Sequence, residues 1–390
     1  MRRGEIQALE ELRRFHPKPP VTPLIRLGDA QLVLARSYGL ESWTRLVLAC
    51  RLTDAIWHGD VAAVHALVAE RPHLLVEDAR GVPGNWGPPM SYAANLGQDA
   101  IVDLLYNLGA PDLQLAFERA CLQGQLATAR HLFAMGARPV MGSVMGPCET
   151  LSGSGLALLL DMGSPLLDKD GDALAPVALM LETYCRNPEG KHACLALAQK
   201  HGVTLPNTAP MALHRGRIDL LSEHLRRDHR LLRRTFTHEE IFPPELGCHA
   251  DPTLALHGTP LAGGTLLHMA VDYDEMKIAQ WLLDEGIHPN TPAAIDKDGF
   301  GGHTALFGCV VSQPWRTNRG RDAEFAQLLL DHGANPNVRA SLKKQLRFVN
   351  DETLHSYRDV TPLGWGRRFH DKDWVSTPVM KLLEQSGGRE

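Results

Sequence analysis

Paired cysteines, long apolar runs and a strong charge of either sign are all missing from this sequence of 390 residues. Its cysteines are odd in number and form no C-x-x-C pair: Cys50, Cys121, Cys148, Cys185, Cys194, Cys248 and Cys309. This pattern argues against a disulfide framework and against a zinc ribbon. It predicts reduced thiols in a cytoplasmic protein.

No stretch of about 18 apolar residues occurs, so no membrane span is expected. The opening segment "MRRGEIQALEELRRF" reads as a charged amphipathic helix and lacks the apolar core of a secretion signal. A formal net charge of -5 gives no general attraction to nucleic acid or to anionic membranes. Phosphate-binding glycine loops and the G-x-S-x-G elbow of hydrolases are also missing.

Aromatic residues are few, at 6%, although 44% of the chain is hydrophobic. Strands of a β-sandwich favour aromatic and β-branched side chains, whereas small and aliphatic residues suit stacked helices. The composition therefore favours an all-α fold.

A repeating pattern is present instead. The segment "TLLHMAVDYDEMKIAQWLLDEGIHPN" predicts a first helix opened by Thr265, a turn near Tyr273, a second helix and a stop at Gly286. Similar pairs begin at residues 52, 88 and 115, and others lie within 303–337 and 360–388. Glycine suits the stop because it enters the left-handed region without steric cost. The chain therefore consists of repeated helix-turn-helix units.

The spacing of the units is irregular. The stop glycines Gly109, Gly136 and Gly163 are 27 residues apart, whereas Gly286 and Gly333 are 47 apart. Three insertions interrupt the array, at 235–264, 312–321 and 339–359, and we expect the third to form a helix around Leu342 to Phe348. Loops this long inside a repeat array are usually functional or disordered.

These motifs resemble the ankyrin repeat. "TLLHMA" matches the family pattern T-P-L-H-x-A, "LLDHGANPNVR" is close to its L-L-x-x-G-A-x-x-N segment, and "DKDG", at 168–171 and 296–299, stands where the family places a β-turn. The resemblance implies an all-α solenoid of stacked helix-turn-helix units with finger loops. Residues 50–390 form the array, with degenerate copies over 143–260. Residues 1–49 form a helical cap whose apolar surface comes from Leu32, Leu34, Ala35, Trp43 and Leu46.

His268 lies in the matching segment and could be read as a catalytic or metal-binding residue. In the family pattern, the threonine and histidine of T-P-L-H fix the start of the first helix by hydrogen bonds. We therefore predict a structural role for His268.

The resemblance implies a bacterial-type, intracellular module that binds another protein on its concave face, without catalysis or a cofactor. The partner and the oligomeric state stay open. Candidate contact residues are exposed aromatic and polar side chains on fingers, turns and insertions: Trp86, Tyr273, Asp274, Phe300, Trp315 and Arg316.

Two other functions stay open. An enzyme or a metal-dependent regulator could have its site in the insertion around 238–257, where Cys248, His249 and His257 are weak metal candidates and Glu239 or Glu240 could act as a base. Nucleic acid could bind an arginine stripe over 215–234, although no stacking aromatics accompany it. The segment "DKDGD" lacks the glycine and glutamate of a calcium loop.

Overall fold

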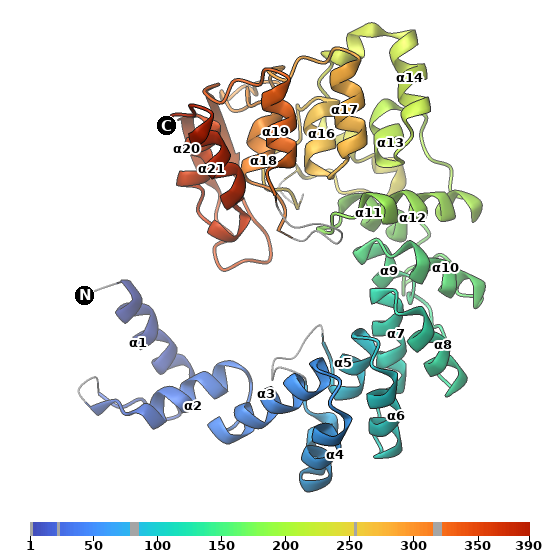
Figure 1. Ribbon diagram of the computed structural model, residues 1–390, viewed down its shortest axis with the longest axis vertical. Helices are drawn as coiled ribbons and strands as arrows, with labels where there is room; N and C mark the ends of the chain where they lie inside the picture. The colour runs from blue at the N-terminus through green and yellow to red at the C-terminus, as the bar shows by residue number, and fades with distance from the viewer. Residues whose placement is uncertain (1–2, 22–23, 79–85, 253–255, 315–321) are drawn as a thin grey trace. The chain divides into compact units, whose positions relative to one another are not determined.

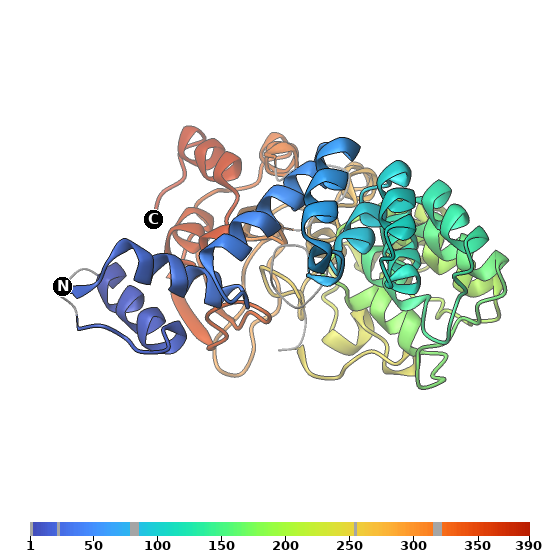
Figure 2. The same ribbon diagram turned by 90° about the horizontal axis from the view of Figure 1, so that it is seen from below.

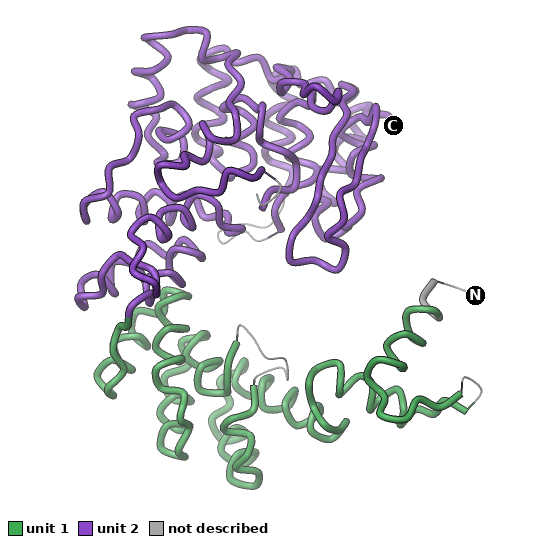
Figure 3. Tube along the Cα trace, turned by 180° about the vertical axis from the view of Figure 1, so that it is seen from behind, with its two compact units in different colours: residues 1–140 green, residues 141–390 purple. Residues whose placement is uncertain are grey.

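The computed structural model describes residues 3–21, 24–78, 86–252, 256–314 and 322–390. The chain divides into two compact units, residues 1–140 and residues 141–390 (Figure 3). Each is built from short helices that pair in sequence order.

The first unit contains helices α1 (Arg3–Phe15), α2 (Leu27–Ser37), α3 (Trp43–Trp57), α4 (Val61–Glu70), α5 (Pro89–Asn95), α6 (Asp99–Asn107), α7 (Leu113–Gln123) and α8 (Leu126–Ala134), with a 3₁₀ turn at Pro72–Val76. The first helices α3, α5 and α7 pack in one row, and their partners α4, α6 and α8 form a second row (Figures 1 and 2). The predicted helix pairs of residues 52–139 are therefore present.

A left-handed residue ends each first helix, at Gly59, Gly97 and Gly124, with φ of 69°, 72° and 70°. A Cβ atom on Gly97 would lie 2.8 Å from Oε1 of Gln125 in the following repeat. Glycine is therefore favoured there by the backbone angle, and a side chain at this position would also displace the end of Gln125.

The leader before the repeats has its own small core, made by Ala35, Leu40, Leu46 and Ala49. Two residues expected to close this core are instead on the surface, since Leu34 is 44% exposed and Trp43 is 37% exposed. Leu34 lies about 100° around α2 from the buried Ala35, and Trp43 is the first residue of α3, where no preceding turn covers it.

The second unit begins with α9 (Met145–Thr150), α10 (Gly153–Asp161), α11 (Ala175–Glu182) and α12 (Pro188–Lys200). Four helix pairs follow: α13 (Ala209–His214) with α14 (Ile218–Arg227), α16 (Leu266–Asp272) with α17 (Met276–Asp284), α18 (Ala305–Val310) with α19 (Glu324–Asp331), and α20 (Pro362–Arg368) with α21 (Thr377–Gln385). The first helices α13, α16, α18 and α20 stack in that order. The fully buried side chains of Phe307 and Trp365 lie in this stack.

The insertion at 235–264 is closed at its base, because the Phe236 N–H donates to Gly264 O and the Gly263 N–H donates to Phe236 O. Inside it lie the single-turn helix α15 (His238–Ile241) and a 3₁₀ turn at Pro244–Leu246. Thr237 and Glu240 cap α15 reciprocally through side-chain hydrogen bonds. The described residues of the insertion, 235–252 and 256–264, are therefore folded as part of the second unit.

The third insertion is an antiparallel hairpin, so the prediction of a helix around Leu342 to Phe348 was wrong. Strand β1 (Ala340–Lys344) pairs with β2 (His355–Val360), with an irregularity between Ala340 and Leu342. Every second residue of β1 is buried, which is the period of a strand with one face covered. A bridge between Gly301 and Ser341 joins the hairpin to the preceding finger.

Both "DKDG" segments form the predicted turn. The side chain of Asp168 accepts hydrogen bonds from the N–H groups of Asp170 and Asp172, and Asp296 accepts from Asp298 and Phe300. Gly171 and Gly299 are left-handed, with φ of 86° and 78°. Within the described residues, no helix is both long and apolar enough to cross a bilayer.

Candidate functional site

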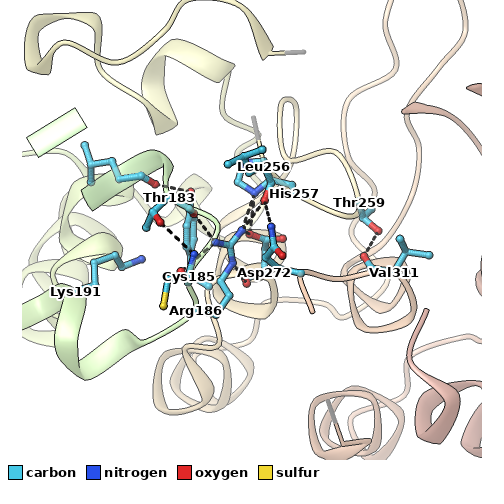
Figure 4. A network of polar contacts seen from close by, with 12 residues as sticks. Thr183, Cys185, Arg186, Lys191, Leu256, His257, Thr259, Asp272 and Val311 are labelled. Carbon is cyan, nitrogen blue, oxygen red and sulfur yellow. Dashed lines mark hydrogen bonds and ion pairs between the residues drawn. The ribbon is translucent and has the colours of Figure 1, made fainter. Parts of the chain in front are cut away.

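A buried arginine joins three segments of the second unit. Arg186 follows α11 and is 1% exposed. Its Nη1 donates to the carbonyls of Thr183 and Cys185, and its Nε donates to the Asp272 carbonyl at 2.8 Å. Its Nη2 lies 2.8 Å from Asp272 Oδ2 and 3.2 Å from the Leu256 carbonyl (Figure 4). The five guanidinium hydrogens are thereby all used within the chain.

The insertion is held by this arrangement. His257 Nδ1 lies 2.9 Å from Asp272 Oδ2 and 3.2 Å from Arg186 Nη2, so the imidazole completes the contact between the insertion and α16. Burial lowers the pKa of His257, although Asp272 acts in the opposite direction. We call Arg186, His257 and Asp272 the insertion clamp. The guanidinium of Arg186 has no hydrogen left for a ligand, whereas Nε2 of the buried His257 has no hydrogen-bond partner among the described residues.

A buried lysine lies next to the clamp. Lys191 Nζ is 3.7 Å from the centre of the Tyr273 ring and 3.4 Å from Nδ1 of His214. Burial lowers the pKa of Lys191 to about 8 and lowers that of His214 well below its usual value. The ring of Tyr273 therefore stabilises the ammonium group in a place from which water is excluded.

The expectation that Tyr273 and Asp274 occupy an exposed turn is wrong. Tyr273 is 3% exposed and Asp274 is 8% exposed. Arg186 and Lys191 both lie over the Tyr273 ring, and Asp274 has a left-handed backbone, with φ of 64°, at the position that glycine holds in the first unit. The turn is buried because the loop after α11 and the insertion pack on it.

Phe300 is half-buried against the third insertion. Its ring centre lies 3.6 Å from Cζ of Arg358 on β2 and 5.0 Å from Nζ of Lys343 on β1. The finger residue therefore anchors the hairpin through cation–π contacts. Trp315 and Arg316 lie outside the described residues.

Trp86 lies in the first unit, over the row of first helices. Its ring packs edge-on against Tyr92 of α5, with 5.6 Å between centroids, and Arg119 of α7 lies 5.9 Å from the Trp86 ring. Arg119 also donates to Asn95 Oδ1 at 3.1 Å. A Cβ atom on Gly87 would lie 2.9 Å from Leu115 Cδ2, so this segment also touches the start of α7.

Trp57, Asn95 and Leu122 occupy equivalent positions, each two residues before the left-handed glycine that ends its helix. We call the side of α3, α5 and α7 that carries them the first-helix face. On α3 this face continues along Trp57, Val47 and Trp43, which are 57%, 37% and 37% exposed. Two tryptophans and a valine thus face outward on one helix.

In the second unit the equivalent residue of α16 is buried, as Asn95 is in α5, so the exposure of Trp57 is a feature of α3. Asp272 stands two residues before the left-handed Asp274, and there the insertion clamp covers it. Further along, Thr259 Oγ1 lies 3.1 Å from the Phe307 carbonyl and 2.9 Å from the Val311 carbonyl at the end of α18. The insertion therefore covers the first helices of the second unit.

The family model of the ankyrin repeat matches residues 262–294, which contain α16 and α17. The chain therefore contains an ankyrin repeat. Its fold is the all-α solenoid that the sequence predicted. No curated protein matches the chain.

Among solved structures, the human ASB11 ankyrin repeat domain is similar to this ankyrin-repeat protein, at 17% identity and a TM-score of 0.26. The comparison covers 77% of this chain and 99% of that chain. The fold assignment rests on the matched repeat and on the stacked helix pairs.

The weak metal candidates of this ankyrin-repeat protein do not come together. Cys248 is buried, and burial raises its pKa. His249 is exposed and pairs with Glu182 at 2.9 Å, whereas His257 belongs to the insertion clamp. Within the described ranges, no group of three or more histidine, cysteine or acidic side chains could hold a metal ion.

The arginine segment is not one continuous stripe. Helix α14 ends at Arg227, and Asp228 turns the chain into a 3₁₀ helix at His229–Leu232. Several of its arginines have acidic neighbours within ion-pair distance: Arg217 with Asp219, Arg227 with Glu223, Arg230 with Asp228, and Arg234 with Glu240. These pairs lower the positive charge that a phosphate backbone would meet.

Sequence reasoning placed the partner on the concave face and named Trp86, but it did not single out Trp57 and it missed the insertion clamp. The face could have been found by aligning Gly59, Gly97 and Gly124, because the residue two before each glycine then includes Trp57. The clamp joins residues 86 positions apart and carries no motif, so no local signal indicated it.

Proposed function

We propose that this ankyrin-repeat protein binds another protein through the first-helix face of residues 1–140 and does no chemistry. In ankyrin repeats, which the chain resembles, the first helices line the concave side of the solenoid. The observation that carries the proposal is Trp57, which is 57% exposed at the position that the insertion clamp covers in the second unit.

The residue types on this face support the proposal. Tryptophan, tyrosine and arginine are the side chains that most often carry binding energy at protein interfaces. Trp86 contacts both Arg119 and the buried ring of Tyr92, which reduces the conformational entropy that ordering Trp86 on binding would cost. Of the contact residues that the sequence predicted, Trp86 lies on this face.

The face is tested in two steps. Affinity capture with the full chain identifies a partner, and the dissociation constant is then measured for Trp57→Ala. Phe348→Ala is the matched control, because Phe348 is an aromatic residue of the hairpin and is 82% exposed. We expect Trp57→Ala to weaken binding at least tenfold, about 1.4 kcal/mol or more, without lowering the melting temperature. Normal binding by Trp57→Ala, or equal loss in both variants, contradicts the proposal.

The thiols support a location in the reducing cytoplasm. All seven cysteines are free, and six of them are buried. Burial raises the pKa of Cys121 and of Cys194 to about 12, so these groups stay as unreactive thiols. A disulfide in protein isolated from its native source would count against this location.

A further inference from the structure

A cavity of about 400 Å³ lies within the second unit. Three segments that are distant in sequence form its walls: the finger at Pro206–Pro210, the end of α14 with the following turn, and the start of the 235–264 insertion. Each of these segments is described by the structure, and none of them takes part in the insertion clamp.

The apolar part of the wall is stiff. It is formed by Pro206, Pro210 and Pro243 together with Leu231 and Phe236. Proline rings fix their own backbone angle, and Pro210, Pro243, Leu231 and Phe236 are buried. The cavity therefore exists before a ligand arrives, and its wall suits the aliphatic stem of a long side chain.

Most charged groups at the cavity are already paired. Arg234 pairs with Glu240, which also accepts from the Thr237 N–H at 2.9 Å. Arg227 lies 3.5 Å from Glu223 outside the cavity, and Asp228 lies 3.0 Å from Arg230. These groups have internal partners and balance one another.

Two carboxylates remain. Glu239 in the first turn of α15 and Glu245 in the next turn line the cavity. Neither makes a hydrogen bond or an ion pair with any residue in the described part of the chain. Both residues are exposed, so the cavity combines an apolar wall with two solvent-exposed carboxylates that have no cationic partner among the described residues.

We propose that the cavity is a binding site for an arginine side chain of a protein partner, which rests on the proposed protein-binding function and adds a second contact to it. The aliphatic stem packs against the prolines, and the guanidinium donates to Glu239 and Glu245. Arginine fits better than lysine because its planar fork presents five donors to two carboxylates at once.

The test uses the full chain and small probes. Binding of N-acetyl-arginine amide is measured by NMR titration beside N-acetyl-citrulline amide, which has the same shape without the charge. We expect the arginine probe to bind and the citrulline probe to bind at least fivefold more weakly. The double variant Glu239→Gln/Glu245→Gln should weaken arginine binding about fivefold, in line with two partly solvated ion pairs. Added salt should weaken it in the same direction.

The control variant is Asp284→Asn/Glu285→Gln, which removes the same net charge at the exposed end of α17. It should bind the arginine probe like the unaltered chain, and all variants should keep the melting temperature. The assignment is overturned if the arginine probe binds no more tightly than the citrulline probe or than N-acetyl-lysine amide. It is also overturned if the two double variants bind the arginine probe with the same affinity. Trp57→Ala tests the first-helix face through the dissociation constant of the protein partner, so the two proposals can fail independently of each other.

Discussion

At the scale of single residues, the imidazole of His268 connects two repeats. The Thr265 N–H donates to Nδ1 of His268 at 3.1 Å, so the proton of the neutral ring is on Nε2. That Nε2–H donates to the His303 carbonyl at 3.0 Å, in the next repeat. The structure confirms the contacts that the sequence pattern predicted for a structural histidine.

We expect His268→Ala to lower the free energy of unfolding by about 1–3 kcal/mol at pH 7, because buried partners lose their hydrogen bonds. Burial lowers the pKa of His268 to about 3, whereas an unfolded histidine titrates near 6.5. Below pH ~6.5 the unfolded chain therefore binds more protons than the folded chain, and the neutral imidazole costs stability as the pH falls. The difference in free energy of unfolding between the unaltered chain and the variant should therefore shrink by about 1.4 kcal/mol for each pH unit below ~6.5.

Urea titrations at pH 7, 6 and 5 measure this difference between the variant and the unaltered chain. His229→Ala is the control, since His229 is exposed on the turn after α14. A deficit that stays constant with pH would show that the imidazole of His268 is not held neutral in the fold.

At the scale of helices and strands, local signals were enough for the helix pairs. Gly109, Gly136, Gly163, Gly286 and Gly333 are all left-handed, as their position after periodic apolar residues indicated. Thr265 caps α16 through its side chain, as the family pattern implied. These features depend on a few neighbouring residues, so the sequence alone predicts them.

The insertions depend on distant residues, and there prediction failed. Leu342 to Phe348 contains residues compatible with a helix, but Ser341 bridges to Gly301 and β1 pairs with β2 instead. Tyr273 looked exposed because it ends a helix, and it is buried by Arg186 and Lys191 from the loop and helix after α11. Such tertiary contacts override local preference.

The insertion clamp gives a prediction for the whole 235–264 element. We expect Arg186→Met to lower the free energy of unfolding by about 3–5 kcal/mol, because it leaves the buried Asp272 carboxylate without its guanidinium partner. Hydrogen exchange at residues 256–264 should rise more than exchange in α20 or α21.

The control is Arg217→Met, which breaks an exposed pair with Asp219 and should cost less than about 1 kcal/mol. Protection of residues 256–264 that is unchanged in Arg186→Met would mean that the clamp does not hold the insertion in place.

At the scale of the whole molecule, the chain combines two units with different surfaces. The first unit leaves large apolar side chains exposed between residues 6 and 61, among them Leu27, Trp43 and Trp57. The second unit covers its first helices with its own insertions and buries Trp365 completely. Exposed aromatic surface of this kind usually marks an interaction site, which supports the partner face proposed for the first unit, whereas the second unit buries more of its own first helices.

This division predicts that residues 141–390 fold without the first unit. The contacts that stabilise the insertion, the hairpin and the stack from α13 to α20 all lie inside this range, including the hydrogen bond from Trp365 Nε1 to Thr259 Oγ1 at 3.1 Å. Neighbouring repeats supply most of the stability of a repeat array, so a unit with a complete set of neighbours should unfold cooperatively. A fragment of residues 141–390 should show the blue-shifted fluorescence of a buried tryptophan. Arg186→Met should lower its free energy of unfolding by the same amount as in the full chain. A fragment that is unfolded, or one in which Arg186→Met has no effect, would show that the first unit is needed to assemble the second.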